Sequence, residues 1–146
     1  MDYPRGSVWS KWDLHVHSPA SFNWNGGTKL RDVHGADRDA LLRSWIMAIN
    51  KADALVFAVM DYWTFDGYLA LREYVHHHPG ELTKTVLPGI ELRVQSPTAH
   101  RLDIHVILSD ELPDQRLRDV LSKLHVQIIN GGLHPLSPDC LREYAR

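Results

Sequence analysis

The chain has 146 residues, of which 44% are hydrophobic and 23% are charged, and its formal net charge is −2 at pH 7. This length and composition predict a single globular domain that buries roughly two-thirds of its unfolded surface. The nearly balanced charge excludes a general attraction to nucleic acid or to anionic membranes, so any such contact would need a local patch.

The chain has a single cysteine, Cys140, and ten histidines. One cysteine cannot form an internal disulfide, which favours a reducing compartment, and we expect a cytoplasmic protein. No apolar run approaches the ~20 residues of a membrane span, and the first residues do not resemble a signal peptide, so no membrane partner is expected. Ten histidines are many for this length and hint at metal chemistry.

The first third of the chain predicts a strand over residues 12–17 and an amphipathic helix over residues 38–52. The connection between them is rich in Gly, Asn and Ser, and a connection this long usually covers a site or is mobile. Asp37 is the expected N-cap, because its carboxylate would accept hydrogen bonds from amides of the first turn. The apolar positions of this helix recur at helical spacing: Leu41, Leu42, Trp45, Ile46 and Ile49.

Residues 54–60 form a continuous apolar run that stops at Asp61. The run is short and has no polar alternation, which predicts a strand buried on both faces, as in a parallel sheet. A second helix should then begin at Asp66 and Gly67 and end at Pro79 and Gly80.

The rest of the chain predicts strands over residues 85–94, 103–108 and 125–129. A helix should begin near Pro113, and another over residues 137–146. Strands and helices that mostly alternate predict an α/β fold with a largely parallel sheet and outer helices. In such sheets functional groups gather at the carboxyl ends of the strands.

Histidine and carboxylate side chains recur along these predicted strands. Successive strand residues face opposite sides, so His15 and His17 should share one face, and imidazole is a common metal ligand. Taken alone, the pair could equally be half-exposed strand residues with local hydrogen bonds. Asp61, Glu91 and His105 lie at or near the ends of the later strands, and this repetition favours a metal site.

Four segments in this order resemble the opening motifs of the polymerase and histidinol phosphatase (PHP) domain, a family of metal-dependent phosphoesterases. They are DLHVHS (residues 13–18), VMDYWTFDG (59–67), LPGIE (87–91) and DIHVIL (103–108). The resemblance covers roughly residues 8–110 and looks closest to the variant at the N-terminus of large SMC-like or AAA-like ATPases. It implies the first part of a distorted (β/α)7 barrel with Zn, Mn or Fe ions at its C-terminal mouth.

The resemblance also implies roles for single residues. His15 and His17 would ligate a first metal, Glu91 would bridge it to a second, and His105 would ligate the second. Asp61 would act in catalysis beside the ligands. The implied reaction is attack of a metal-bound hydroxide on a phosphoester, with nucleic acid or nucleotides as substrates when the domain is joined to an ATPase.

Arg93 follows Glu91 by two residues and should share its face of the strand. Guanidinium binds phosphate through two hydrogen bonds, so Arg93 could contact the substrate. Pairing with a nearby carboxylate is an equal alternative.

The chain departs from the family pattern at two ligand positions. Tyr62 stands where many members have a metal-binding histidine, and Asn23 stands near another, so the resemblance predicts one or two ions rather than three. His134 is expected to be a surface histidine in a turn before a helix.

Family members carry further ligands on later strands, so residues 1–146 are interpreted as an incomplete PHP-like domain, the N-terminal portion of a longer barrel or protein. The alternative function is a degenerate, non-catalytic PHP domain that acts as a structural or interaction module of a larger ATPase. An incomplete barrel would also expose apolar sheet edges, which predicts self-association.

Overall fold

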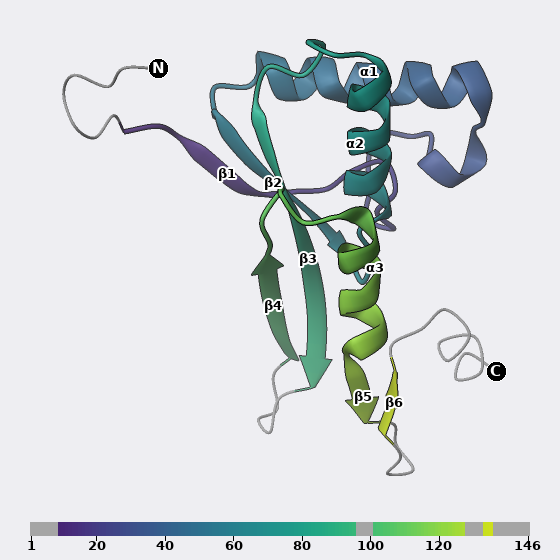
Figure 1. Ribbon diagram of the computed structural model, residues 1–146, viewed down its shortest axis with the longest axis vertical. Helices are drawn as coiled ribbons and strands as arrows, with labels where there is room; N and C mark the ends of the chain where they lie inside the picture. Colours follow the sequence, from purple (N-terminus) through teal and green to yellow (C-terminus); the bar gives the residue numbers. More distant parts are fainter. Residues whose placement is uncertain (1–8, 96–100, 128–132, 136–146) are drawn as a thin grey trace. The chain divides into compact units, whose positions relative to one another are not determined.

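A computed structural model of the chain describes residues 9–95, 101–127 and 133–135. The chain divides into two compact units, Met1–Asp110 and Glu111–Arg146. The first unit has the mixed α/β architecture expected from the sequence, with a four-stranded sheet and two long helices (Figure 1).

The elements of the first unit follow one another as strand, helix, strand, helix, strand, strand. They are β1 (Trp12–Val16), the 3-10 turn η1 (Leu30–Asp32), α1 (Gly35–Lys51), β2 (Val56–Tyr62), α2 (Asp66–His77), β3 (Thr85–Gln95) and β4 (Arg101–Ile107). The second unit contains α3 (Asp114–Lys123) and a hairpin of β5 (His125–Gln127) and β6 (Leu133–Pro135).

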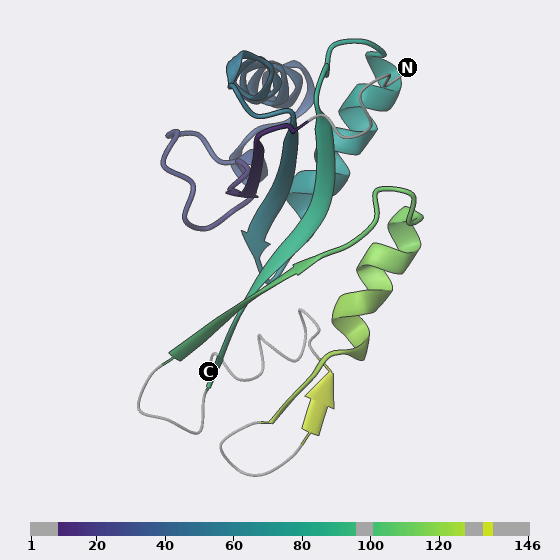
Figure 2. The ribbon, with the colours of Figure 1, turned by 90° about the vertical axis from the view of Figure 1, so that its left-hand side faces the viewer.

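The sheet has the strand order β1-β2-β3-β4. The first three strands are parallel and β4 is antiparallel to β3, so the expectation of a mostly parallel sheet is confirmed (Figure 2). Residues 57–61 of β2 are all buried, as expected for a strand covered on both faces. The pairing of β1 with β2 shifts register between Asp13 and Val16.

Helix α1 buries four of the five expected apolar side chains, with Leu41 half-buried, and its start corrects the sequence prediction. It begins at Gly35, whose φ of 52° is a left-handed conformation that favours glycine. His34 is therefore the N-cap, and Asp37 lies within the first turn instead of capping it. The buried side chains are Leu42, Trp45, Ile46 and Ile49.

Two further sequence predictions need correction. Strand β2 does not stop before Asp61 but continues through Tyr62, because both residues pair with β3. His134 was expected in a turn, but it lies in strand β6, where it pairs with Val126 of β5. The helix predicted over residues 137–146 lies outside the described residues, as does Cys140.

Helix α2 occupies the span expected from its Asp-Gly start and Pro-Gly end. Among the described residues, no helix combines the length and apolar character needed to cross a membrane.

Candidate metal centre

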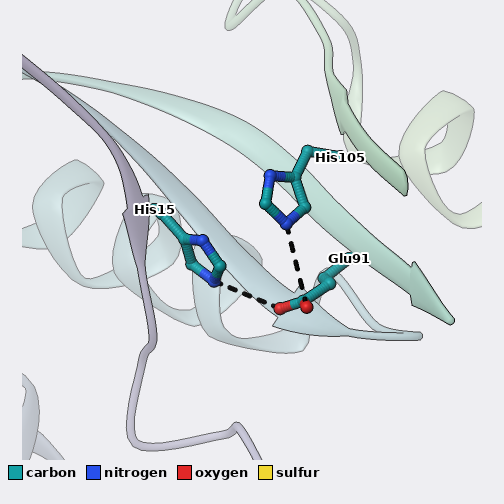
Figure 3. A group of neighbouring side chains, drawn as sticks. All are labelled: His15, Glu91 and His105. Carbon is teal, nitrogen blue, oxygen red and sulfur yellow. Dashed lines mark hydrogen bonds and ion pairs between the residues drawn. The ribbon is translucent and has the colours of Figure 1, made fainter. Parts of the chain in front are cut away.

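Three side chains from three strands converge on one point in the first unit (Figure 3). His15 comes from β1, Glu91 from β3 and His105 from β4. Nε2 of His15 lies 3.2 Å from one oxygen of the Glu91 carboxylate, and Nε2 of His105 lies 3.7 Å from the other. One ligand atom of each residue lies within 4.8 Å of those of the other two.

Backbone pairing explains how residues so far apart in sequence meet. Glu91 is directly opposite His105 in the antiparallel pair and directly opposite Tyr62 in the parallel pair. Residues paired in this way project from the same face of a sheet. The register shift in β1 then places His15 over this face, where its ring centroid is 4.5 Å from that of His105.

Burial differs sharply between the carboxylate and the two imidazoles. The Glu91 side chain is 3% exposed, whereas those of His15 and His105 are 45% and 40% exposed. The group therefore has a buried anionic base and a rim of imidazoles that a solute can reach. Buried carboxylates are normally paired or coordinate a metal, and here the neighbours of Glu91 are imidazoles.

His17 lies beside this group, but its ligand atoms are not part of it. Its ring centroid is 5.2 Å from that of His15, and its ring stacks on Tyr62 at 5.4 Å. Its Nδ1 faces the Ser21 hydroxyl at 3.4 Å and the Asp61 carboxylate at 3.9 Å. The structure therefore brings together His15, Glu91 and His105 and leaves His17 adjacent.

Asp61 is fully buried and is bound by the segment that follows His17. The backbone N–H of Ser18 donates to one carboxylate oxygen at 2.8 Å, and the Ser18 hydroxyl donates to the other at 2.5 Å. Burial raises the pKa of Asp61 from its ordinary value, with a smaller increase from the charge of Asp66, while the Ser18 hydrogen bonds and His17 act in the opposite direction.

Gly67 makes this arrangement sterically feasible. A Cβ atom at this position would overlap with the Ser18 hydroxyl and the Asp61 carboxylate. Helix α2 can therefore approach the buried pair only because its second residue has no side chain.

Tyr62 makes two aromatic contacts beside the group. Besides stacking on His17, it packs against the exposed ring of Phe22, with a centroid distance of 4.8 Å. Asn23 is exposed, and its backbone N–H donates to the Ser21 hydroxyl.

Arg93 pairs with Asp103 in the β3–β4 register, while its side chain lies outside the described part of the chain, as does that of His134.

The sequence indicated no part in the site for Ser18, Ser21 or Gly67. Both serines are fully buried although they follow a strand in a polar connection. A Ser directly after the His-x-His pair, combined with a Gly at the start of the second helix, is the pattern that could have indicated a buried carboxylate between them.

No protein-family model and no curated protein sequence matches this chain.

The chemistry and spacing of the three side chains fit a divalent cation. Zinc binds imidazole nitrogen and carboxylate oxygen at about 2.0–2.2 Å, so two ligands of one ion lie roughly 3–4 Å apart. The separations of His15 and His105 from Glu91, 3.2 and 3.7 Å, fall in this range. Two imidazoles and one carboxylate also form the ligand set of many catalytic sites, which leave a coordination position open.

Proposed function

We propose that this chain is a PHP-type metal-dependent phosphoesterase domain whose metal is held by His15, Glu91 and His105. The observation that carries the proposal is the convergence of these three ligand types from three strands. The four motifs of the sequence support it, because the segments that resemble the family provide these side chains. The four-stranded α/β sheet agrees with the first part of such a barrel.

The arrangement assigns distinct tasks to the chain's own residues. The buried Glu91 carboxylate would hold a cation by its negative charge. The imidazoles of His15 and His105 would complete the ligand set on the side that faces solvent. The hydrogen bonds between Asp61 and Ser18 fix the segment that carries His17. The His17 ring lies next to that of His15, where it would hold or transfer a proton. When bound, a divalent ion supplies Lewis-acid activation of water and neutralises charge on a phosphoester.

The experiment combines metal content with hydrolysis. The full chain is loaded with Zn²⁺ or Mn²⁺, freed of excess metal, and analysed by mass spectrometry for bound metal and with bis-p-nitrophenyl phosphate for activity. We expect about one equivalent of metal and measurable hydrolysis. Both should be lost together in Glu91→Gln and in His105→Ala.

The matched control is His77→Ala, which removes an exposed histidine at the end of α2. It should keep both metal and activity. Absence of bound metal in the wild-type chain, or hydrolysis that persists unchanged in Glu91→Gln, would overturn the proposal.

The alternative is a degenerate PHP domain that acts as a non-catalytic module of a larger ATPase. The observation that favours it is the stacking of Tyr62 on His17, which occupies a position where the family has a ligand. This alternative predicts that His15→Ala and Glu91→Gln leave the chain folded and metal-free like the wild type. Bound metal without hydrolysis would favour a module with a structural metal.

A further inference from the structure

A cavity of about 380 Å³ lies in the first unit, away from the three metal-ligating side chains. Its walls come from the connection after β1 and from the starts of α1 and α2, two helices labelled in Figure 1. Ala20, Leu30 and Val33 provide an apolar wall. The volume is in the range of pockets that bind small organic molecules, about 300–1,000 Å³.

The polar side chains of the cavity are mostly basic. Arg31, His34 and Arg38 line it, and Asp66 is the acidic side chain among the lining residues. With two guanidinium groups against one carboxylate, the lining carries a net positive charge even when His34 is neutral. Guanidinium groups bind phosphate with two parallel hydrogen bonds and are suited to this ligand.

Both arginines already have acidic neighbours, but these do not line the cavity. Nε of Arg31 lies 3.7 Å from Asp32, and Nη2 of Arg38 lies 3.0 Å from Glu73. Each of these pairs uses one nitrogen of a group that carries five N–H donors. The pairs therefore leave donors on both guanidinium groups for a ligand.

The backbone adds to the same electrostatic preference. Arg38 lies in the first turn of α1, and Asp66 is the first residue of α2. The N-cap residue of α1, His34, makes no side-chain hydrogen bond to the first turn, whereas in α2 the Thr64 hydroxyl accepts a hydrogen bond from the Asp66 N–H. The positive end of the α1 dipole thus reinforces the basic side chains at the cavity.

We propose that this cavity is a binding site for a small organic phosphate monoester. The phosphate contacts the guanidinium groups of Arg31 and Arg38, and a short apolar group of the ester lies against Leu30 and Val33. The site is separate from the metal centre, because its lining shares no residue with His15, Glu91 and His105.

The test uses the full chain after removal of metal, at constant ionic strength. Phenyl phosphate and inorganic phosphate are titrated while amide resonances are followed by NMR. We expect saturable one-site binding, with the largest shifts at Ala36 and Arg31, and several-fold tighter binding of phenyl phosphate. Arg31→Gln should weaken binding at least tenfold, and it suits the test because the Arg31 side chain is exposed and its loss should not affect folding.

The matched control is Arg43→Gln, which removes an exposed arginine of α1 that pairs with Glu81 outside the cavity. It should leave binding unchanged. Non-saturating shifts, or unchanged affinity in Arg31→Gln, would overturn the proposal. Equal affinity for both phosphates would overturn the assignment to an organic ester.

The two sites are distinguished by a second arm with added Zn²⁺. Binding that requires the metal and is lost in Glu91→Gln would place the anion at the metal centre, which contradicts the cavity site. Failure of metal binding alone leaves the phosphate titration unaffected, so the two proposals can fail independently.

Discussion

Glu91 on β3 and His105 on β4 face each other directly across an antiparallel strand pair, with 3.7 Å between Oε1 and Nε2. Their relative position is set by backbone hydrogen bonding and not by a loop. Glu91 is also held by its parallel pairing with Tyr62. Sites built on paired strands keep their geometry more precisely than sites on loops, so this half of the metal centre should be formed before any ion binds.

The different positions of His15 and His17 lead to the first prediction. His15→Ala should weaken Zn²⁺ binding strongly, because its Nε2 belongs to the group around Glu91, whereas His17→Ala should weaken it less. Changes beside a ligand already cost about 10–100-fold in affinity, so losing a ligand should cost at least as much. Competition with a chromophoric chelator measures both constants. Equal losses in the two variants would show that His17 is a direct ligand.

Most of the fold could be predicted from the sequence because hydrophobic periodicity is local. The apolar run before Asp61 indicated a buried strand, and the spacing of Trp45, Ile46 and Ile49 indicated the buried face of α1. The start of α1 could not be predicted in the same way. It depends on the left-handed backbone of Gly35, which no periodic pattern reveals.

A metal site built from His15, His17, Glu91 and His105 was predictable, but not which of these residues lie closest together. His15, Glu91 and His105 could be singled out as residues that bind metals, and the structure brings them together. Their grouping depends on the antiparallel direction of β4 and on the register shift in β1, both of which are long-range features. For the same reason His17, two residues from His15, is near the group without joining it.

Gly67→Ala should destabilise the chain, because the added Cβ would overlap with Ser18 and Asp61. Overpacking of this kind costs about 1–3 kcal/mol. Urea denaturation of the metal-free chain measures the free energy of unfolding. His76→Ala, on the exposed side of the same helix, should change it by less than about 0.5 kcal/mol. A Gly67→Ala variant as stable as this control would contradict the close approach of α2 to the buried pair.

Asp61 should make the free energy of unfolding fall as pH rises, which is the opposite of what a carboxylate with a lowered pKa does. Burial raises the pKa of Asp61, so the folded state holds this proton more tightly than the unfolded chain does. The stability contributed by this group is therefore complete at low pH and decreases as pH rises from about 3.8 through the higher pKa of the folded state.

Asp61→Asn cannot lose a proton, so its stability relative to wild type should rise with pH across this window. Urea denaturation at several pH values in the absence of metal tests this. Asp53→Asn, at an exposed position beside Lys11, is the control. Parallel pH profiles for wild type and Asp61→Asn would refute the effect.

The outer strands of the sheet should make the chain associate with itself. Within the described residues β1 and β4 end the sheet, and they expose apolar side chains such as Leu14, Leu102 and Ile104. Unpaired strand edges with apolar side chains readily add another strand. Sedimentation velocity should therefore show oligomers that grow with concentration, and Ile104→Lys should shift them toward monomer. Met47→Lys, an equally drastic change on the exposed face of α1, should not. A wild-type chain that stays monomeric at every concentration would mean that these edges are covered in solution.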